Sequence, residues 1–366
     1  MAQSSRLFQP LKVGNVTLQH RVVMAPLTRY RANKDHIPLS YVKEYYEQRA
    51  SVPGTLLTTE ATFISKRAGG YANVPGIYSK EQIAAWKEVT DAVHAKGSFI
   101  HLQLWALGRV AKPDILEANG FEVVSASDVP YEEGKHIPRP LTVDEIQIFV
   151  ADYAQAARNA IEAGFDGVEI HGANGYLIDQ FIQDVSNKRQ DQYGGSIENR
   201  ARFAVEVTSA VVAAVGADKV GIRLSPHSTF QGMEMDDPVP QFTYVIQQLK
   251  KFKLAYLHVV QSYIEGRDNA TDQITFAVEA WDNTSPVLVA GGLNADTAKA
   301  LVDDRFKDRD VAVVFGRYFI STPDLPFRIQ KGLSFNPYDR NTFYLPESRQ
   351  GYTDYPFSEE FVKAAA

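Results

Sequence analysis

Short apolar, β-branched runs alternate with longer amphipathic stretches along almost the whole chain. Each apolar run spans four to seven residues, and apolar side chains at three- and four-residue spacing follow after a loop. We predict strands at residues 21–25, 55–59, 98–104, 166–170, 220–224, 255–260, 287–290 and 311–315. We predict helices at residues 41–51, 80–95, 143–163, 197–215, 238–251, 271–281, 295–302 and 324–331. Eight strand–helix repeats in one chain predict an α/β fold, the (β/α)8 TIM barrel.

Two helix starts carry a capping signature. Ser79 with Gln82, and Thr142 with Glu145, have the spacing of a capping box, in which a hydroxyl and a later side chain satisfy free backbone amides. Near the N-terminus, residues 11–19 alternate apolar and polar side chains around a Gly-Asn pair. This pattern predicts a β-hairpin, which we place at the barrel floor.

The segment after the third predicted strand is unusually long. Residues 106–140 contain several prolines and predict an excursion that forms a small subdomain or a lid. Residues 231–237, after the fifth strand, are a second candidate lid, although their acidic side chains also fit solvated surface. No low-complexity linker interrupts the chain, so we expect one domain over residues 1–366.

Composition narrows the class of protein. The 366 residues carry a net charge of -6, and Lys and Arg are scattered, so nothing points to nucleic acid. Cysteine is absent, which excludes disulfides, thiolate nucleophiles, iron–sulfur clusters and cysteine-bound zinc. No stretch approaches the roughly 20 apolar residues of a membrane span, and the N-terminus does not resemble a signal peptide. We therefore expect a soluble, cytoplasmic protein that uses no membrane.

Polar side chains stand where such barrels carry their chemistry, at the C-terminal ends of the strands. Alternation along a strand puts every second side chain on one face. Gln103 and Trp105 therefore share a face of the third strand, and His171 and Arg223 end the fourth and fifth. A purely structural barrel would place Val, Ile or Leu there, so the sequence predicts a functional site at the C-terminal ends of the strands.

Glycines follow the seventh and eighth strands, where TIM barrels often bind phosphate. Gly291 and Gly292 follow the seventh strand, and Gly316 and Arg317 follow the eighth. A tight turn needs glycine in any case, so one pair alone is weak evidence. Both turns together favour a phosphorylated cofactor or substrate.

A His-x-x-Asn-x-Tyr run, formed by His171, Asn174 and Tyr176, directly follows the fourth strand. Two hydrogen-bond donors and one phenol are suited to polarise and protonate a ligand. Taken singly, the histidine also fits a buried core residue and the tyrosine an aromatic wall.

Six motifs in the chain resemble those of the Old Yellow Enzyme family of FMN-dependent ene-reductases. They are APLTRYRA, HLQLW, GVEIHGANGYLIDQF, QYGGSIENRARF, GIRLSP and VVFGRYFISTPDLPFRI. They occur in the order of the family and cover the chain from residue 7 to the GYTDYP run near its end.

The resemblance implies a tightly but non-covalently bound FMN. Thr28 would hydrogen-bond flavin O4, and Gln103 would hydrogen-bond the pyrimidine edge of the flavin. Arg223 would lie near flavin N1 and O2, would pair with Glu169, or would do both. The glycine turns and Arg317 would hold the phosphate. The implied cofactor residues are Ala25, Pro26, Leu27, Thr28, Ala61, Gln103, His171, Arg223, Gly291, Gly292, Phe315, Gly316 and Arg317.

The resemblance also implies a ping-pong reaction with NADPH or NADH as reductant. His171 and Asn174 would bond the carbonyl oxygen of an α,β-unsaturated substrate while hydride passes from flavin N5 to its β-carbon. Tyr176 would then protonate the α-carbon. The substrate would be a small enone or nitroalkene, shaped by Trp105, Phe230, Thr275 and Tyr352.

Departures from the family and rival functions limit the choice. In some specialised fungal relatives phenylalanine replaces the tyrosine, so Tyr176 argues for net reduction.

No predicted strand offers the inner lysine of a Schiff-base aldolase, and the first-strand ligands of metal-dependent barrels are missing, so we expect no metal. A flavin-binding protein without turnover, or a reductase or isomerase of specialised metabolism on this scaffold, remains the alternative. Monomer and homodimer are both compatible with the sequence.

Overall fold

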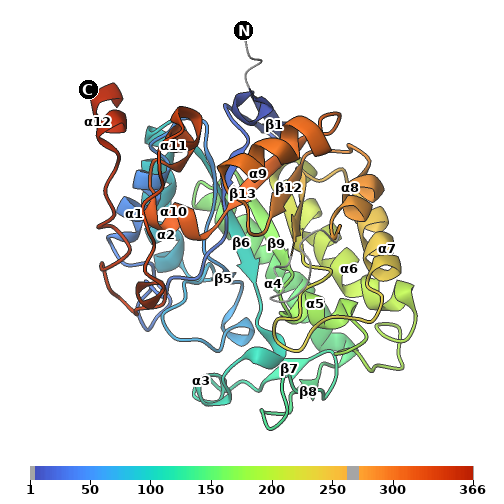
Figure 1. Cartoon of the computed structure of the whole chain (residues 1–366). Coiled ribbons are helices and arrows are strands. Elements are labelled where there is room, and N and C mark those ends of the chain that lie inside the picture. Colours follow the sequence, from blue (N-terminus) through green and yellow to red (C-terminus); the bar gives the residue numbers. More distant parts are fainter. Residues whose placement is uncertain (1–4, 262–271, 366) are drawn as a thin grey trace.

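The computed structural model describes residues 5–261 and 272–365. Within these ranges, eight parallel strands close into a barrel, which confirms the predicted (β/α)8 fold (Figure 1). Around the barrel the order is β4-β3-β13-β12-β11-β10-β9-β6, and β6 pairs back with β4. The strands are β3 (Val22–Met24), β4 (Leu56–Thr58), β6 (Phe99–Trp105), β9 (Gly167–Gly172), β10 (Val220–Leu224), β11 (Tyr256–Val260), β12 (Val287–Ala290) and β13 (Val311–Phe315). Their ends lie within two residues of the predicted ones.

Helices surround the barrel at the predicted places. They are α1 (Val42–Arg49), α2 (Lys80–Ala95), α4 (Val143–Glu162), α6 (Ile197–Val215), α7 (Val239–Lys250), α8 (Thr275–Trp281), α9 (Ala295–Ala300) and α11 (Leu325–Lys331). The predicted start of the sixth helix, residue 271, lies outside the described residues. Both capping boxes are present, at Ser79 with Gln82 and at Thr142 with Glu145.

Several short elements were not predicted. They include the helices α10 (Arg317–Ser321) and α12 (Glu359–Ala365), a π-helical turn at Leu301–Arg305 that extends α9, and 3-10 turns at Arg6–Phe8, Lys66–Ala68, Gly108–Val110, Ala217–Lys219 and Arg340–Thr342. Such short elements have too few residues to show a helical period in the sequence. None of the described helices combines the length and apolarity needed to cross a membrane.

The predicted hairpin closes the barrel floor. β1 (Leu11–Val13) and β2 (Val16–Leu18) pair antiparallel, and their apolar side chains pack against the barrel interior. The Asn15 backbone N–H donates to the Asp218 carbonyl (3.1 Å), at the N-terminal end of β10. Gly14 has φ 53°, and a Cβ there would lie 1.9 Å from the same carbonyl oxygen, so this close approach requires glycine.

The predicted excursion lies at the opposite end of the barrel from the hairpin (Figure 1). It contains α3 (Pro113–Glu117) and two short paired strands, β7 (Val124–Ser125) and β8 (Arg139–Pro140). At the same end lie α5 (Leu177–Ile182), which follows β9, and β5 (Thr62–Phe63), which pairs with the end of β6. These segments build walls above the C-terminal ends of the strands.

Candidate active site

A cavity opens at the C-terminal ends of the barrel strands, where the sequence predicts chemistry. Its lining comes from the loops after β3 and β4, the ends of β6, β9 and β10, and the segment that leads into α5. The lining residues are Pro26, Thr28, Ala61, Gln103, Trp105, His171, Asn174, Tyr176 and Arg223. The structure therefore brings together polar side chains that the sequence distributes over separate strands.

His171 is a neutral hydrogen-bond donor. Its side chain is buried, and Nδ1 accepts a hydrogen bond from the Ala173 backbone N–H (3.3 Å), which places the ring proton on Nε2. Burial lowers the pKa of His171 well below its ordinary 6.5, and the nearby Arg223 charge lowers it further. The imidazole thus offers an N–H to the cavity without carrying a charge.

The backbone around Asn174 is fixed from the loop after β10. Asn174 adopts a left-handed conformation with φ 58°, which asparagine tolerates better than most residues. Its N–H donates to Ser225 Oγ (2.7 Å), and its carbonyl accepts from Gln231 Nε2 (2.8 Å). Among the described residues no group hydrogen-bonds the Asn174 side-chain amide, so this amide can donate to a ligand in the cavity.

Tyr176 contributes a protonated phenol. Its ring meets those of Trp105 and His171 edge to face, with centroids 4.8 and 4.9 Å apart. Burial raises the pKa of the phenol above its ordinary 10, the neighbouring Tyr71 adds to this, and a hydrogen bond with the Gln231 side chain lowers it in part. At neutral pH the phenol therefore keeps a proton that it can give to a ligand.

Gln103 and Arg223 lie on the inner wall of the cavity. Gln103 Nε2 donates to Glu169 Oε1 (2.7 Å), and Glu169 Oε2 bonds His258 Nδ1 (2.8 Å). The sequence allows Arg223 to pair with Glu169, but the two side chains form no direct ion pair. No carboxylate of the described residues lies within ion-pair distance of Arg223. The buried Nε of Arg223 has no hydrogen-bond partner there, so the guanidinium can serve a ligand.

The two glycine turns lie side by side, because β12 pairs with β13. A Cβ on Gly291 would lie 2.0 Å from the Gln261 carbonyl oxygen, whereas a Cβ on Gly292 would meet nothing within 4 Å. Over the described chain, the backbone N–H groups of Gly292 and Gly316 have no hydrogen-bond partner. Arg317 is exposed, and its Nη1 donates to the Tyr338 hydroxyl (3.2 Å). Open amides beside a cation are suited to hold an anion.

Three further predicted cofactor residues surround this region without lining the cavity. The Ala25 N–H donates to the Phe315 carbonyl (2.9 Å) across the pairing of β3 with β13. A Cβ on Gly316 would contact Leu27 Cδ2 at 3.4 Å. Ala25, Leu27 and Phe315 therefore connect the first strand of the barrel to the glycine turn after the last one.

Of the four predicted substrate-pocket residues, the structure places only Trp105 in the cavity. Phe230 projects from the loop after β10 and is 59% exposed. Thr275 begins α8, and its Oγ1 accepts a hydrogen bond from Arg305 Nη2 (3.0 Å). Tyr352 is fully buried and stacks on Tyr45 with ring centroids 4.0 Å apart. The packing of Tyr352 against Tyr45 and the hydrogen bond between Arg305 and Thr275 join residues far apart in the chain, so the local sequence does not reveal these positions.

Three tyrosines near the cavity were missed. Tyr30, Tyr71 and Tyr344 lie close enough to Tyr176 to raise the pKa of its phenol. The ring centroid of Tyr71 is 5.9 Å from that of Trp105, and the centroids of Tyr30 and Tyr344 are 5.8 Å apart. Tyr30 has a sequence signal, two residues after Thr28, but Tyr344 reaches the site only through tertiary contact.

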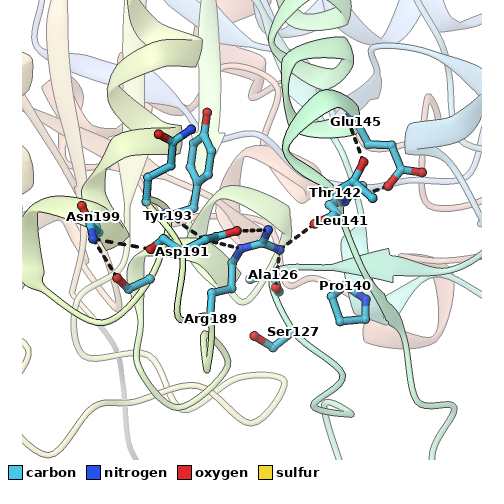
Figure 2. Close-up of polar contacts among 12 residues, drawn as sticks. Ala126, Ser127, Pro140, Leu141, Thr142, Glu145, Arg189, Asp191, Tyr193 and Asn199 are labelled. Atoms are coloured by element: carbon cyan, nitrogen blue, oxygen red, sulfur yellow. Dashed lines mark hydrogen bonds and ion pairs between the residues drawn. The ribbon is translucent and has the colours of Figure 1, made fainter.

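A half-buried arginine attaches the excursion to the barrel (Figure 2). Arg189, in the loop between α5 and α6, donates from Nη1 to the carbonyls of Ala126 (2.9 Å) and Leu141 (2.7 Å). These carbonyls lie just after β7 and β8, and Asp191 forms an ion pair with the same guanidinium (2.6 Å). The residues around the QYGGSIENRARF motif thus fix the position of the excursion.

Arg109, at the start of the excursion, connects it to the loop after β10. Its guanidinium donates to the carbonyls of Val129 and Pro130 (both 3.3 Å) and of Gln231 (3.0 Å) and Gly232 (3.3 Å). Because Gln231 in turn bonds Asn174, these contacts link both predicted lid segments to the cavity. Across the described ranges, no set of three or more His, Asp or Glu side chains is arranged to hold a metal ion.

Comparison with known proteins gives consistent results. The family described as "NADH:flavin oxidoreductase / NADH oxidase family" matches residues 6–336. The chain is 60% identical to "Chanoclavine-I aldehyde reductase fgaOx3" of Penicillium roqueforti, over 98% of both chains. It is 55% identical to "Probable inactive reductase easA" of Epichloe festucae var. lolii, over 98% of this chain and 97% of the other. The solved structure of Old Yellow Enzyme from Pichia sp. AKU4542 superposes with a TM-score of 0.90, at 40% identity, over 97% of this chain and 94% of that one.

Proposed function

Because the chain belongs to the NADH:flavin oxidoreductase / NADH oxidase family, we propose that it is an FMN-dependent ene-reductase. It would use NADPH or NADH to reduce the C=C bond of α,β-unsaturated carbonyl compounds. One observation supports this proposal most: the two donors His171 and Asn174 and the phenol of Tyr176 line the same cavity as Gln103 and Arg223. We place the reaction in the cytoplasm, in a monomer or a homodimer.

The residues present fit FMN. Arg223 keeps a buried Nε without a partner among the described residues, as expected of a cation that meets a ligand. Gln103 presents an amide, which both donates and accepts, and Thr28 adds a hydroxyl. The open turn at Gly292, with Arg317 nearby, would take the phosphate.

Bound FMN would supply hydride transfer, which no amino-acid side chain provides. His171 Nε2–H and the Asn174 amide would both donate to the carbonyl oxygen of the acceptor. Their donation withdraws electron density from the conjugated C=C bond and stabilises the negative charge that develops on the oxygen. Tyr176 would give its proton to the α-carbon, and the hydrogen bond from Gln231 would stabilise the resulting phenolate.

The names of relatives suggest the kind of carbonyl compound. Besides the Penicillium roqueforti reductase, a relative from Cladobotryum sp. that is 52% identical is named "Aldehyde reductase FrzD". We therefore propose α,β-unsaturated aldehydes as the preferred substrates, alongside enones and nitroalkenes. A second candidate, a flavin-binding protein without turnover, is favoured by the relatives named as inactive.

Absorbance of the purified protein tests the proposal directly. We expect a yellow protein whose flavin bleaches anaerobically with NADPH and recolours when cinnamaldehyde or 2-cyclohexenone is added. A yellow protein that bleaches but is not recoloured by any enal, enone or nitroalkene would exclude ene-reduction. One that never bleaches with NADPH or NADH would support the non-catalytic alternative, and a colourless protein that cannot take up FMN would contradict both.

A further inference from the structure

A buried polar network lies inside the barrel, one step below the cavity, and Glu169 on β9 is its centre. Glu169 precedes His171 by two residues and so faces the same side of the strand, nearer the barrel floor. Its side chain is 0% exposed. Oε1 accepts from Gln103 Nε2 (2.7 Å), and Oε2 bonds His258 Nδ1 (2.8 Å). The proposed chemistry assigns no role to this carboxylate.

Neighbouring residues hold Glu169 in place. β10 lies beside β9 and β11, and its Gly221 is in register with both Glu169 and Tyr256. A Cβ on Gly221 would lie 2.2 Å from the Tyr256 ring, so the absence of a side chain makes room for this ring. The Tyr256 hydroxyl lies 3.4 Å from His101 Nδ1. Burial and the nearby Glu169 carboxylate raise the pKa of the Tyr256 phenol well above its ordinary 10, so the hydroxyl keeps its proton. Packing and hydrogen bonds therefore prevent the carboxylate from turning away.

Glu169 is ionised at neutral pH. Burial raises the pKa of its carboxyl, but His258, the Arg223 charge and Gln103 lower it by more, to about 2. An ionised carboxylate only accepts hydrogen bonds. The edge of Gln103 that faces it at 2.7 Å must therefore be the NH2 group, because a reversed amide would place two acceptor oxygens together.

The orientation of the Gln103 amide then determines what the cavity offers. Gln103 lines the cavity, and its Oε1 accepts no hydrogen bond from the described residues. A free carbonyl oxygen is suited to a ligand that presents a ring N–H. The pyrimidine ring of a flavin has one such group, the imide N3–H, between two carbonyls.

We propose that Glu169 is a positioning residue that orients Gln103 so that its carbonyl oxygen meets the imide N–H of the flavin. This inference rests on the proposed function, because it takes FMN as the ligand. Glu169 would not touch the cofactor and would act only through Gln103. Recognition of the cofactor would then depend on Glu169, which lies below the cavity, as well as on Gln103, which lines it.

The affinity of the apoprotein for FMN tests the proposal. It is measured by the quenching of flavin fluorescence on binding. In Glu169→Gln, the side chains at positions 103 and 169 are both amides that donate and accept, so the Gln103 amide is free to turn. We therefore expect this variant to bind FMN about tenfold more weakly than the wild type. Gln103→Glu places two carboxylates face to face and should bind more weakly still. The reciprocal double variant Gln103→Glu/Glu169→Gln restores a donor between the two positions, so it should bind FMN more tightly than Gln103→Glu.

His258→Gln is the matched control, because a glutamine NH2 group can still donate to Glu169 Oε2 and Gln103 is left unchanged. It should keep FMN affinity near that of the wild type. Wild-type affinity in Glu169→Gln would overturn the proposal, as would a double variant that binds no better than Gln103→Glu. Thermal unfolding of each apoprotein separates loss of stability from loss of FMN recognition.

A second ligand keeps the test decisive even if a variant fails to fold. 3-Methyl-FMN lacks the imide N–H, so the wild-type apoprotein should bind it about tenfold more weakly than FMN. In Glu169→Gln this preference should shrink, which a merely structural carboxylate would not cause. Equal binding of the two flavins by the wild type would overturn the inference, whereas failure of the wild type to bind FMN would contradict the proposed function instead.

Discussion

At the scale of single residues, burial sets the protonation states of the cavity side chains. His171 is neutral because burial and the Arg223 charge disfavour its charged form. Tyr176 is protonated because burial disfavours a phenolate. Both groups therefore keep their protons at neutral pH, where they can donate to a ligand.

Tyr176→Phe isolates the phenol. We expect reoxidation of the bound flavin by an enal or enone to slow by about 10²- to 10⁴-fold, the usual contribution of a general acid. Reduction by NADPH and binding of FMN should stay close to wild type, because the ring and its packing remain. Stopped-flow absorbance measures the two half-reactions separately. Wild-type reoxidation in Tyr176→Phe would exclude the phenol as the proton donor.

The lowered pKa of His171 gives a pH prediction. A histidine with a pKa well below 6.5 gains its second proton only at low pH, so Nε2–H remains a neutral donor as pH rises from about 6 to about 8. We expect no inflection from His171 in the rate of flavin reoxidation over this range. An inflection near pH 6.5 that disappears in His171→Asn would show that the imidazole is charged during the reaction.

The sequence predicts a site residue well when its position follows from a strand end. Gln103, His171 and Arg223 are such residues, and the structure brings them into one cavity. Tyr352 and Tyr344 show where prediction from the sequence fails. Both lie in the C-terminal segment, and only packing against Tyr45 or Tyr30 decides which of them approaches the cavity.

At the scale of elements, regular strands were easier to predict than the segments above them. Each barrel strand is a short β-branched run, and its partners follow from the order of the repeats. The excursion has no such period. Its conformation depends on Arg109 and Arg189, which bond backbone carbonyls far away in the sequence, and carbonyls leave no mark on the residue pattern.

Arg189→Ala tests the attachment of the excursion. Two carbonyls, those of Ala126 and Leu141, would lose their donor, so we expect the free energy of unfolding to fall by about 1–3 kcal/mol. Residues 126–141 should exchange backbone amide protons faster than in the wild type. Arg158→Ala, on the exposed face of α4, is the control and should change neither quantity. Unchanged exchange in Arg189→Ala would show that the excursion is held by other contacts.

At the scale of the whole molecule, the C-terminal segment crosses back to the loop after the first barrel strand. Three buried arginines, Arg29, Arg31 and Arg49, donate to its carbonyls, among them those of Gly351 (2.7 Å), Ser348 (2.8 Å) and Tyr352 (3.2 Å), respectively. The eight repeats predicted the barrel, but they gave no sign of this contact, because it joins residues about 300 positions apart.

Arg31→Ala should loosen the C-terminal segment as a unit. Arg31 is fully buried and bonds several carbonyls, so we expect a loss of about 2–4 kcal/mol in the free energy of unfolding by urea. Arg349→Ala removes an exposed ion pair with Glu44 and should cost less than about 1 kcal/mol. Equal effects of the two substitutions would mean that the buried arginine does not anchor the segment.

The hairpin formed by β1 and β2 has a kinetic consequence. Because it fills one end of the barrel, a flavin seated at the other end presents only its outer face to solvent. Electron donor and electron acceptor would then share a single entrance, and each would exclude the other while bound. Excess acceptor should therefore slow turnover by competing with NADPH, and added NADPH should relieve this inhibition.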